Sequence, residues 1–239
     1  MKLLSIGNSF SQDAQRYLHR VAKEDGESLK TVNLYIGGCT LRTHYINMLE
    51  DLELYDFQFN GESTGLKVSI REALISDEWD VITLQQASHK SYDYDSYTPY
   101  IEELYDYVKT YAPKAKIYIH ETWAYERESE RLLSRGFATP EDMLVGIRSA
   151  YGRARALIGA DGFIPSGEAV QRALELGLPR FHRDTFHASY GVGRYLLALV
   201  WYKVLFGKDI TENTFSDFDE PVTDEERRIA IAAVNDTVK

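Results

Sequence analysis

Two segments near opposite ends of the chain carry residues that could act together in nucleophilic catalysis. The first is Gly7-Asn8-Ser9-Phe10-Ser11, which follows a short apolar run and precedes a helical pattern. A serine at that junction would lie at the carboxyl end of a strand and beside helix N–H groups, which suit an attacking oxygen and an oxyanion. Ser9 or Ser11 could equally cap the helix, which is a common use of serine.

The second segment runs from Arg183 to Ser189. Asp184 stands three residues before His187, just ahead of a long helical pattern. In a turn, this spacing can bring the carboxylate to Nδ1 of the imidazole and leave Nε2 free to accept a proton from a hydroxyl. Such pairs are common in turns and caps, so the spacing favours catalysis only together with Ser9.

Aromatic and histidine side chains follow two other apolar runs and are candidates for substrate contacts. His120 and Trp123 come at the end of one run, where Trp123 offers a flat face to a sugar ring or an acyl group. Tyr92 and Tyr94 belong to a tyrosine-rich stretch after the preceding run, in which acidic residues alternate with the rings. Loops of this composition suit carbohydrate, but ordinary packing explains the same residues about as well.

Neither a metal site nor a cysteine-based mechanism is expected. His120 and Glu121 stand side by side, but a zinc site needs further ligands at a spacing that the chain lacks. Cys39 is the single cysteine, so it can form no intramolecular disulfide and no thiolate cluster. The sequence therefore predicts no metal and no cofactor.

Short, continuous apolar runs alternate with amphipathic helical patterns along the chain. Runs without polar alternation are typical of parallel strands that are buried on both faces. Alternation of strand and helix predicts right-handed crossovers and a three-layer α/β/α sandwich around a mostly parallel sheet. The expected strands are residues 2–6, 31–36, 81–84, 116–120 and 162–164, and the expected helices are residues 13–23, 101–111, 142–158 and 191–206.

Two segments depart from that alternation. Residues 54–59 and 66–70 alternate apolar and polar side chains on either side of Asn60-Gly61, which predicts a β-hairpin insertion with a loop longer than two residues. Residues 124–140 are rich in charge and predict a solvated helical insertion. No linker or repeat divides the chain, so residues 1–239 are expected to form one domain.

Composition restricts the kind of partner. The chain holds 27 Lys plus Arg against 37 Asp plus Glu, a formal net charge of −10, which disfavours nucleic acid. No apolar run is long enough to cross a bilayer, and no signal peptide is recognisable at the start. We expect no membrane partner. The location stays open between a cytoplasmic one and, if a leader has been removed, a secreted or periplasmic one. Composition does not predict the oligomeric state.

Together, three motifs resemble the SGNH (GDSL-type) hydrolase superfamily in residue type, order and position: Gly7-Asn8-Ser9-Phe10-Ser11, Gly37-Gly38 after the second expected strand, and Asp184-x-x-His187. The resemblance covers nearly the whole chain. It implies a flavodoxin-like three-layer fold and ester hydrolysis through an acyl-enzyme. It further implies Ser9 as the nucleophile, His187 as the general base and Asp184 as the partner that orients it.

The resemblance also implies an oxyanion hole built from the backbone N–H of Ser9, that of Gly38 or Gly37, and one side-chain amide. The superfamily usually takes the amide from a Gly-x-Asn-Asp sequence, and this chain has Gln85-Gln86 at that place. Either glutamine could supply the amide, and strand alternation slightly favours Gln86. Both could instead bond backbone groups at the strand end. Asn8 replaces the usual aspartate before the serine and keeps a short side chain that can brace the turn.

The sequence thus predicts a serine esterase that hydrolyses small acyl esters, in particular O-acetyl groups on a carbohydrate. The net charge favours a neutral, hydroxyl-rich substrate over a polyanionic one. A lipase or thioesterase of the same superfamily is one alternative, although no apolar lid is evident. A catalytically silent carbohydrate-binding protein on the same fold is another, and the presence of Ser9, His187 and Asp184 argues against it.

Overall fold

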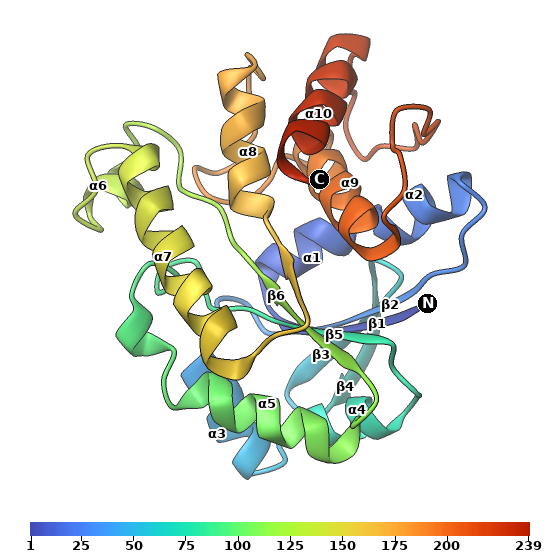
Figure 1. Cartoon of the computed structure of the whole chain (residues 1–239), viewed down its shortest axis with the longest axis vertical. Coiled ribbons are helices and arrows are strands. Elements are labelled where there is room, and N and C mark those ends of the chain that lie inside the picture. Colours follow the sequence, from blue (N-terminus) through green and yellow to red (C-terminus); the bar gives the residue numbers. More distant parts are fainter.

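A seven-stranded sheet runs through the centre of the molecule, with helices on both faces (Figure 1). The structure, a computed structural model, describes residues 1–239. The strand order is β4-β3-β2-β1-β5-β6-β7. The five strands β2, β1, β5, β6 and β7 run parallel to one another, and β3 and β4 pair in antiparallel fashion at one edge. The mostly parallel α/β/α sandwich predicted from the sequence is confirmed. The strands are β1 (Lys2–Gly7), β2 (Lys30–Tyr35), β3 (Tyr55–Phe59), β4 (Glu62–Val68), β5 (Val81–Leu84), β6 (Lys116–His120) and β7 (Gly162–Ile164).

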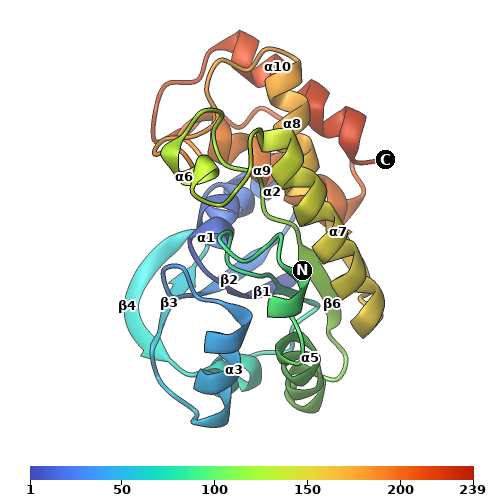
Figure 2. The ribbon, with the colours of Figure 1, turned by 90° about the vertical axis from the view of Figure 1, so that its left-hand side faces the viewer.

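The helices form two layers, one on each face of the sheet (Figure 2). Each layer packs on the sheet through its own apolar core. Successive residues of β1 point to opposite faces of the sheet, so Leu3 joins one core and Leu4 joins the other. One layer consists of α1 (Ser9–Gln15), α2 (Leu18–Glu24), α8 (Ser166–Glu175), α9 (Val192–Phe206) and α10 (Asp224–Thr237). The other consists of α3 (Leu41–Leu49), α4 (Ile70–Ile75), α5 (Tyr100–Tyr111) and α7 (Pro140–Ile158).

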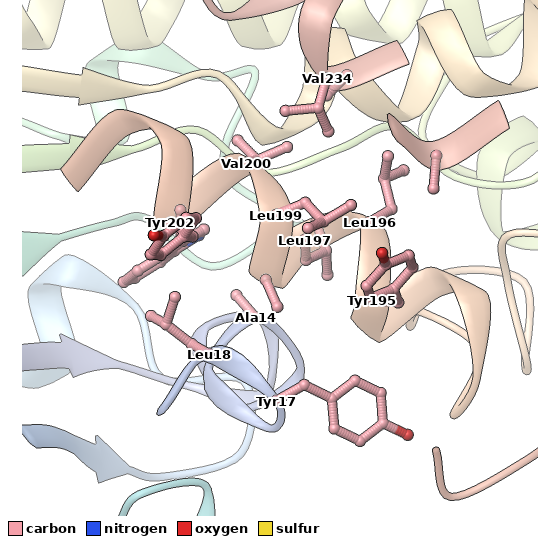
Figure 3. Packing of buried hydrophobic residues seen from close by; sticks show 14 of the residues in the cluster. Ala14, Tyr17, Leu18, Tyr195, Leu196, Leu197, Leu199, Val200, Tyr202 and Val234 are labelled. Carbon is pink, nitrogen blue, oxygen red and sulfur yellow. The ribbon is translucent and has the colours of Figure 1, made fainter. Parts of the chain in front are cut away.

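Helix α9 is apolar around most of its circumference because it is covered on several sides. On this helix, Leu197 lies toward Ala14 of α1 and Tyr202 lies near Leu18 of α2 (Figure 3). Val200 lies toward Val234 of α10. All of these side chains are fully buried. This packing fixes the start of α9, near the end of the chain, against the first helix, which follows β1.

The predicted hairpin exists, but its loop is shorter than expected. β4 begins at Glu62, directly after Asn60-Gly61, and both turn residues have positive φ, 48° and 82°. Two such residues form the tight turn that matches strand twist. The first four residues of β4 lack an apolar pattern because the strand is an exposed edge with no buried face. The hairpin also pairs with β2, so it extends the central sheet.

The helices differ from the sequence-based prediction in extent. The helix expected over residues 13–23 is two helices, of which α1 starts four residues earlier, at Ser9. Helices α3, α4, α8 and α10 were not predicted. The charged insertion contains only one short helix, α6 (Glu130–Leu133), and otherwise follows an irregular path. None of the helices is both long and apolar enough to span a bilayer.

Candidate active site

Ser9 is the first residue of α1, and only Asn8 separates it from Gly7 at the end of β1. The helix cap is Asn8, whose Oδ1 accepts the N–H of Phe10 at 3.0 Å. Ser11 completes the cap, since its Oγ accepts the backbone N–H of Asn8 at 3.0 Å. Gly7 permits this close turn, because a Cβ there would lie 2.1 Å from Ser11 Oγ. Capping is therefore carried out by Asn8 and Ser11, and the Ser9 hydroxyl is left for another role.

The Asn8 side chain also joins its own turn to two neighbouring segments. Its Nδ2 donates to the carbonyl of Cys39 at 3.1 Å, in the loop after β2. Its Oδ1 accepts from Gln85 Nε2 at 2.8 Å, at the end of β5. An aspartate could not make the donated bond, because a carboxylate only accepts. Asn8 thus holds the turn that carries Ser9 beside the loop that carries Gly38.

A tight loop before α9 presents the histidine and the aspartate. His182 and Ala188 form an antiparallel bridge, and Arg183 N–H donates to the carbonyl of His187 at 2.9 Å. The loop is also tied to the segment after β6, where Trp123 Nε1 donates to the carbonyl of Phe186 at 2.7 Å. These bonds hold the backbone of the loop on both sides of His187.

Ser9, His187 and Asp184 form one hydrogen-bonded chain. Ser9 Oγ lies 2.8 Å from His187 Nε2, and His187 Nδ1 lies 2.8 Å from Asp184 Oδ2. The other Asp184 oxygen accepts the backbone N–H of His187 at 2.9 Å. Partial burial opposes ionisation of Asp184, but the bonds from His187 outweigh it and keep the pKa of this carboxyl below its usual range. An ionised Asp184 favours the tautomer with the proton on Nδ1, which leaves Nε2 to accept the serine proton.

A buried ion pair connects the histidine loop to α1. Asp13, one turn after Ser9, is fully buried, and its carboxylate accepts from Arg183 Nη1 at 2.8 Å and from Arg194 Nε at 2.9 Å. It also accepts the backbone N–H of Ala188 at 3.2 Å, next to the histidine. Asp13 is thus the positioning residue that joins the serine and histidine segments.

We expect Asp13→Asn to lower the free energy of unfolding by about 3 kcal/mol, because removing one partner leaves buried charge uncompensated. Urea denaturation measures this change. Asp219→Asn is the matched control, since Asp219 pairs with Arg194 at the partly exposed end of the same network and should cost about 1 kcal/mol or less. Equal losses for the two variants would contradict the positioning role of Asp13.

A cavity of about 340 Å³ opens beside the Ser9 hydroxyl. Ser9, His187 and Gly38 line it together, as the motif-based prediction requires. The N–H groups of Ser9 and Gly38 donate to no other atom of the protein, and Gly38 has a positive φ of 64°, which suits glycine. Two free backbone donors therefore border the space next to the Ser9 hydroxyl.

The prediction that Gln86 or Gln85 supplies an oxyanion amide requires correction. Gln86 Nε2 donates both of its protons to Ser96, to the carbonyl at 3.0 Å and to the hydroxyl at 3.1 Å. Gln85 is buried between Asn8 and His120, whose Nδ1 lies 2.7 Å from Gln85 Oε1. Neither residue lines the cavity. Gln85 braces the serine turn, and Gln86 fixes the loop after β5.

The predicted substrate contacts also lie elsewhere. Trp123 is fully buried and stacks on Phe10 with 4.1 Å between ring centres. His120 is fully buried as well, and burial lowers its pKa to about 3. Tyr92 packs against Phe137, and Tyr94 lies under Arg153. None of the four predicted residues lines the cavity, and the segments after β5 and β6 contribute Ser88, His89 and Tyr125 to its wall instead.

Glu121, after β6, is a fully buried carboxyl outside the cavity. One oxygen accepts the N–H of Glu168 at 3.1 Å, and the other has no partner. Burial, and then the charge of Glu168, raise its pKa to about 8. The folded carboxyl is therefore mostly protonated at neutral pH, whereas in the unfolded chain it ionises near 4.5. The stability that depends on the neutral carboxyl is complete below pH 4.5 and declines as pH rises toward 8.

We expect Glu121→Gln to remove that decline. The variant should exceed the wild type in free energy of unfolding by about 2 kcal/mol or more at pH 8, and the difference should shrink toward acid pH. Urea denaturation at several pH values measures it, with exposed Glu130→Gln as the control. A constant difference between the Glu121→Gln and wild-type curves at all pH values would contradict the assigned protonation.

Several lining residues were not identified from the sequence. The charged insertion supplies Arg131 and Arg135, which had been interpreted as part of a solvated helix. Phe186, Tyr125 and Tyr35 form the aromatic part of the wall together with Phe10 of the serine motif. Arg131, Arg135 and Tyr125 reach the cavity only through the path of the insertion. Phe186 directly precedes His187, and Tyr35 is the last residue of β2, so their positions beside the site could have been found from the sequence. No group of three or more His, Cys, Asp and Glu side chains is arranged to hold a metal.

Comparison with known proteins gives one family and a common fold. The family described as a domain of unknown function, DUF4886, matches residues 2–237. A DUF4886 family protein from Bacteroides uniformis is 32% identical, with a TM-score of 0.91 over 100% of this chain and 94% of that one. A proposed SGNH hydrolase from Slackia heliotrinireducens is 22% identical, with a TM-score of 0.61 over 86% of this chain and 98% of that one. An acetylxylan esterase from Geobacillus stearothermophilus is 16% identical, with a TM-score of 0.51 over 86% of this chain and 94% of that one. No curated protein matches the chain.

Proposed function

This chain belongs to the DUF4886 family, and we propose that it is a serine esterase that hydrolyses small acyl esters through an acyl-enzyme at Ser9. The observation that carries the proposal is the continuous hydrogen-bonded chain from Ser9 Oγ through His187 to Asp184. A serine in contact with a base, which is itself oriented by a carboxylate, is the arrangement that activates a hydroxyl for acyl transfer. The fold shared with SGNH hydrolases and esterases agrees with this chemistry.

In the first half of the reaction, His187 Nε2 accepts the Ser9 proton while Oγ attacks the ester carbonyl. The negative charge that develops on the carbonyl oxygen is stabilised by the N–H groups of Ser9 and Gly38. Asp184 stabilises the imidazolium through Nδ1. The tetrahedral intermediate collapses when the ester C–O bond breaks, and His187 gives its proton to the departing alcohol oxygen. The acyl group is then bonded to Ser9.

In the second half, water replaces the alcohol. His187 removes a proton from the water as its oxygen attacks the acyl carbonyl, and the same two N–H groups stabilise the second oxyanion. Breakage of the bond to Ser9 Oγ releases the carboxylic acid, and the serine recovers its proton from His187. Each half passes one proton through Nε2, so no external oxidant, reductant or cofactor is needed.

We propose O-acetyl groups on a carbohydrate as the substrate. The cavity wall contains arginines, histidines, serines and backbone groups beside its few aromatic rings, which suits a short acyl group on a polar alcohol. A long-chain lipase or thioesterase would need a continuous apolar groove. The likeness in fold to an acetylxylan esterase is consistent with carbohydrate esters, as an analogy.

The proposal is tested by acetate release from acetylated mono- and oligosaccharides and by a series of p-nitrophenyl esters of increasing acyl length, with the Ser9→Ala protein as the blank. Turnover that requires Ser9 and falls with chain length supports the proposal. A preference for octanoate over acetate would contradict the small acyl group. Absence of turnover on every ester would contradict the esterase itself.

A further inference from the structure

The cavity beside Ser9 is positively charged, although the chain as a whole carries a formal charge of −10. Arg131 and Arg135 line it, together with His89 and His187, and no Asp or Glu does. Asp184 lies on the opposite side of the His187 ring from Ser9, because it contacts Nδ1 and the serine contacts Nε2. The reacting serine is thus faced by two guanidinium groups and by no carboxylate.

The two arginines differ from their neighbours in having no acidic partner. Arg127 of the same insertion pairs with Glu141 at the protein surface, and Arg183 pairs with Asp13. Neither Arg131 nor Arg135 forms a salt bridge, although glutamates are frequent in the insertion. Their hydrogen-bond donors are therefore available to a ligand.

Arg131 is held in place by aromatic rings. Its guanidinium carbon lies 3.9 Å from the centre of the Phe186 ring, and the Phe186 ring lies 3.8 Å from that of His187. A cation over a ring face is favourably placed. This stacking keeps the guanidinium close to the reacting groups and reduces the entropy lost when an anion binds.

The charge of the two arginines is felt inside the cavity. The imidazole of His89 has a pKa below its usual value, first because of burial and then because Arg135, Lys90 and Arg131 oppose a further positive charge. His89 is thereby kept neutral, and it adds polarity without cancelling the attraction for an anion.

On the basis of the proposed esterase function, we infer that the preferred substrate is an ester that carries a carboxylate, which Arg131 and Arg135 bind while Ser9 attacks. Planar guanidinium groups match the geometry of a carboxylate and can bind it through paired N–H bonds. A uronic acid that is acylated on a hydroxyl and a half-ester of a dicarboxylic acid share this chemistry, the first with the charge on the alcohol side and the second with it on the acyl side. The local charge thus reverses the expectation of a neutral substrate that the composition gave.

The experiment compares two matched pairs of esters. 3-Acetoxybenzoate against 3-acetoxybenzamide places the charge on the alcohol side, and p-nitrophenyl hemisuccinate against p-nitrophenyl butyrate places it on the acyl side. The kcat/KM ratio of the anionic to the neutral member is measured for the wild type, for Arg131→Gln, for Arg135→Gln and for the double variant. Comparing this ratio between proteins cancels the intrinsic reactivity of the esters.

For one of the two pairs, we expect the ratio of anionic to neutral kcat/KM to fall about three- to fivefold in each single variant. In the double variant it should fall about tenfold or more, mainly because the KM of the anionic ester rises. A change in kcat/KM that the neutral and the anionic ester share leaves the ratio unchanged, so only a selective loss on the anionic ester supports the inference. Raising the ionic strength should reduce the wild-type preference, because screening weakens exposed charges. Arg127→Gln, which removes equal charge from the same insertion, should leave the ratio unchanged.

A ratio that the double variant does not change in either pair overturns the inference and leaves the esterase proposal intact. Absence of turnover on all four esters instead contradicts the esterase proposal. Calorimetric binding to the Ser9→Ala protein then decides the inference separately. Tighter binding of 3-acetoxybenzoate than of 3-acetoxybenzamide supports an anion site if the difference disappears when Arg131→Gln and Arg135→Gln are added to the Ser9→Ala protein. Equal binding of the two esters to the Ser9→Ala protein overturns the inference.

Discussion

Ser9→Ala is expected to lower kcat/KM for p-nitrophenyl acetate by about 10⁴-fold or more, leaving only the contribution of binding and of the oxyanion donors. The physical reason is that alanine has no oxygen to attack the carbonyl, while the N–H at this position remains. Initial rates, corrected for spontaneous hydrolysis, measure the loss. Far-ultraviolet circular dichroism should be unchanged, because the Ser9 hydroxyl contacts only His187.

Ser11→Ala is the matched control for this variant. Ser11 lies two residues further along α1, and its hydroxyl bonds to the backbone of Asn8 and to Asn33. We expect Ser11→Ala to lower the free energy of unfolding by about 1 kcal/mol, as loss of a cap does, and to retain most of the turnover per folded molecule. Loss of turnover in Ser11→Ala with full activity in Ser9→Ala would reverse the two roles and contradict the mechanism.

Asp184→Asn is expected to lower kcat by about 10²- to 10⁴-fold with a much smaller change in KM. An asparagine amide that points its NH₂ toward Nδ1 favours the tautomer with the proton on Nε2, which cannot accept the serine proton. The Asp184 side chain is 47% exposed, so water partly replaces its charge and we expect the lower half of that range. Steady-state kinetics on p-nitrophenyl acetate separate kcat from KM.

Asp184→Ala tests the same bond in another way, because it removes the carboxylate without supplying a competing donor. We expect it to be no less active than Asp184→Asn. A loss below about fivefold in both variants would mean that the carboxylate does not orient His187, and the account would then reduce to a serine and histidine pair.

The architecture could be predicted because its signals are local, and the hydrogen bonds among Ser9, His187 and Asp184 agree with the grouping that the family resemblance implies. Each buried strand is a short apolar run, and the carboxyl ends of parallel strands lie at one edge of the sheet. Ser9 lies two residues after the end of β1, and His187 lies shortly before α9, the most apolar helix. Burial of that helix against α1 requires the two ends of the chain to meet, so the sequence pattern and the spatial contact agree.

The rest of the site could not be predicted because it depends on where side chains point after a strand has ended. The alternation of side chains between the two faces of the sheet no longer applies after Leu84, where β5 ends. Both glutamines that follow turn into the protein, where Gln85 bonds Asn8 and Gln86 bonds Ser96. The aromatic residue Trp123 offered a binding surface in the sequence, but it packs under Phe10 in the structure. Arg131 reaches the cavity only through the irregular path of residues 124–140.

The most direct test of the account is covalent labelling with a fluorophosphonate followed by mass spectrometry of the digested protein. The account predicts a single adduct on the peptide that contains Ser9, no adduct in Ser9→Ala, and strongly slowed labelling in His187→Ala, because the hydroxyl needs its base to attack phosphorus. Folded wild-type protein that remains unlabelled, or that carries its adduct on a residue other than Ser9, would contradict the central claim.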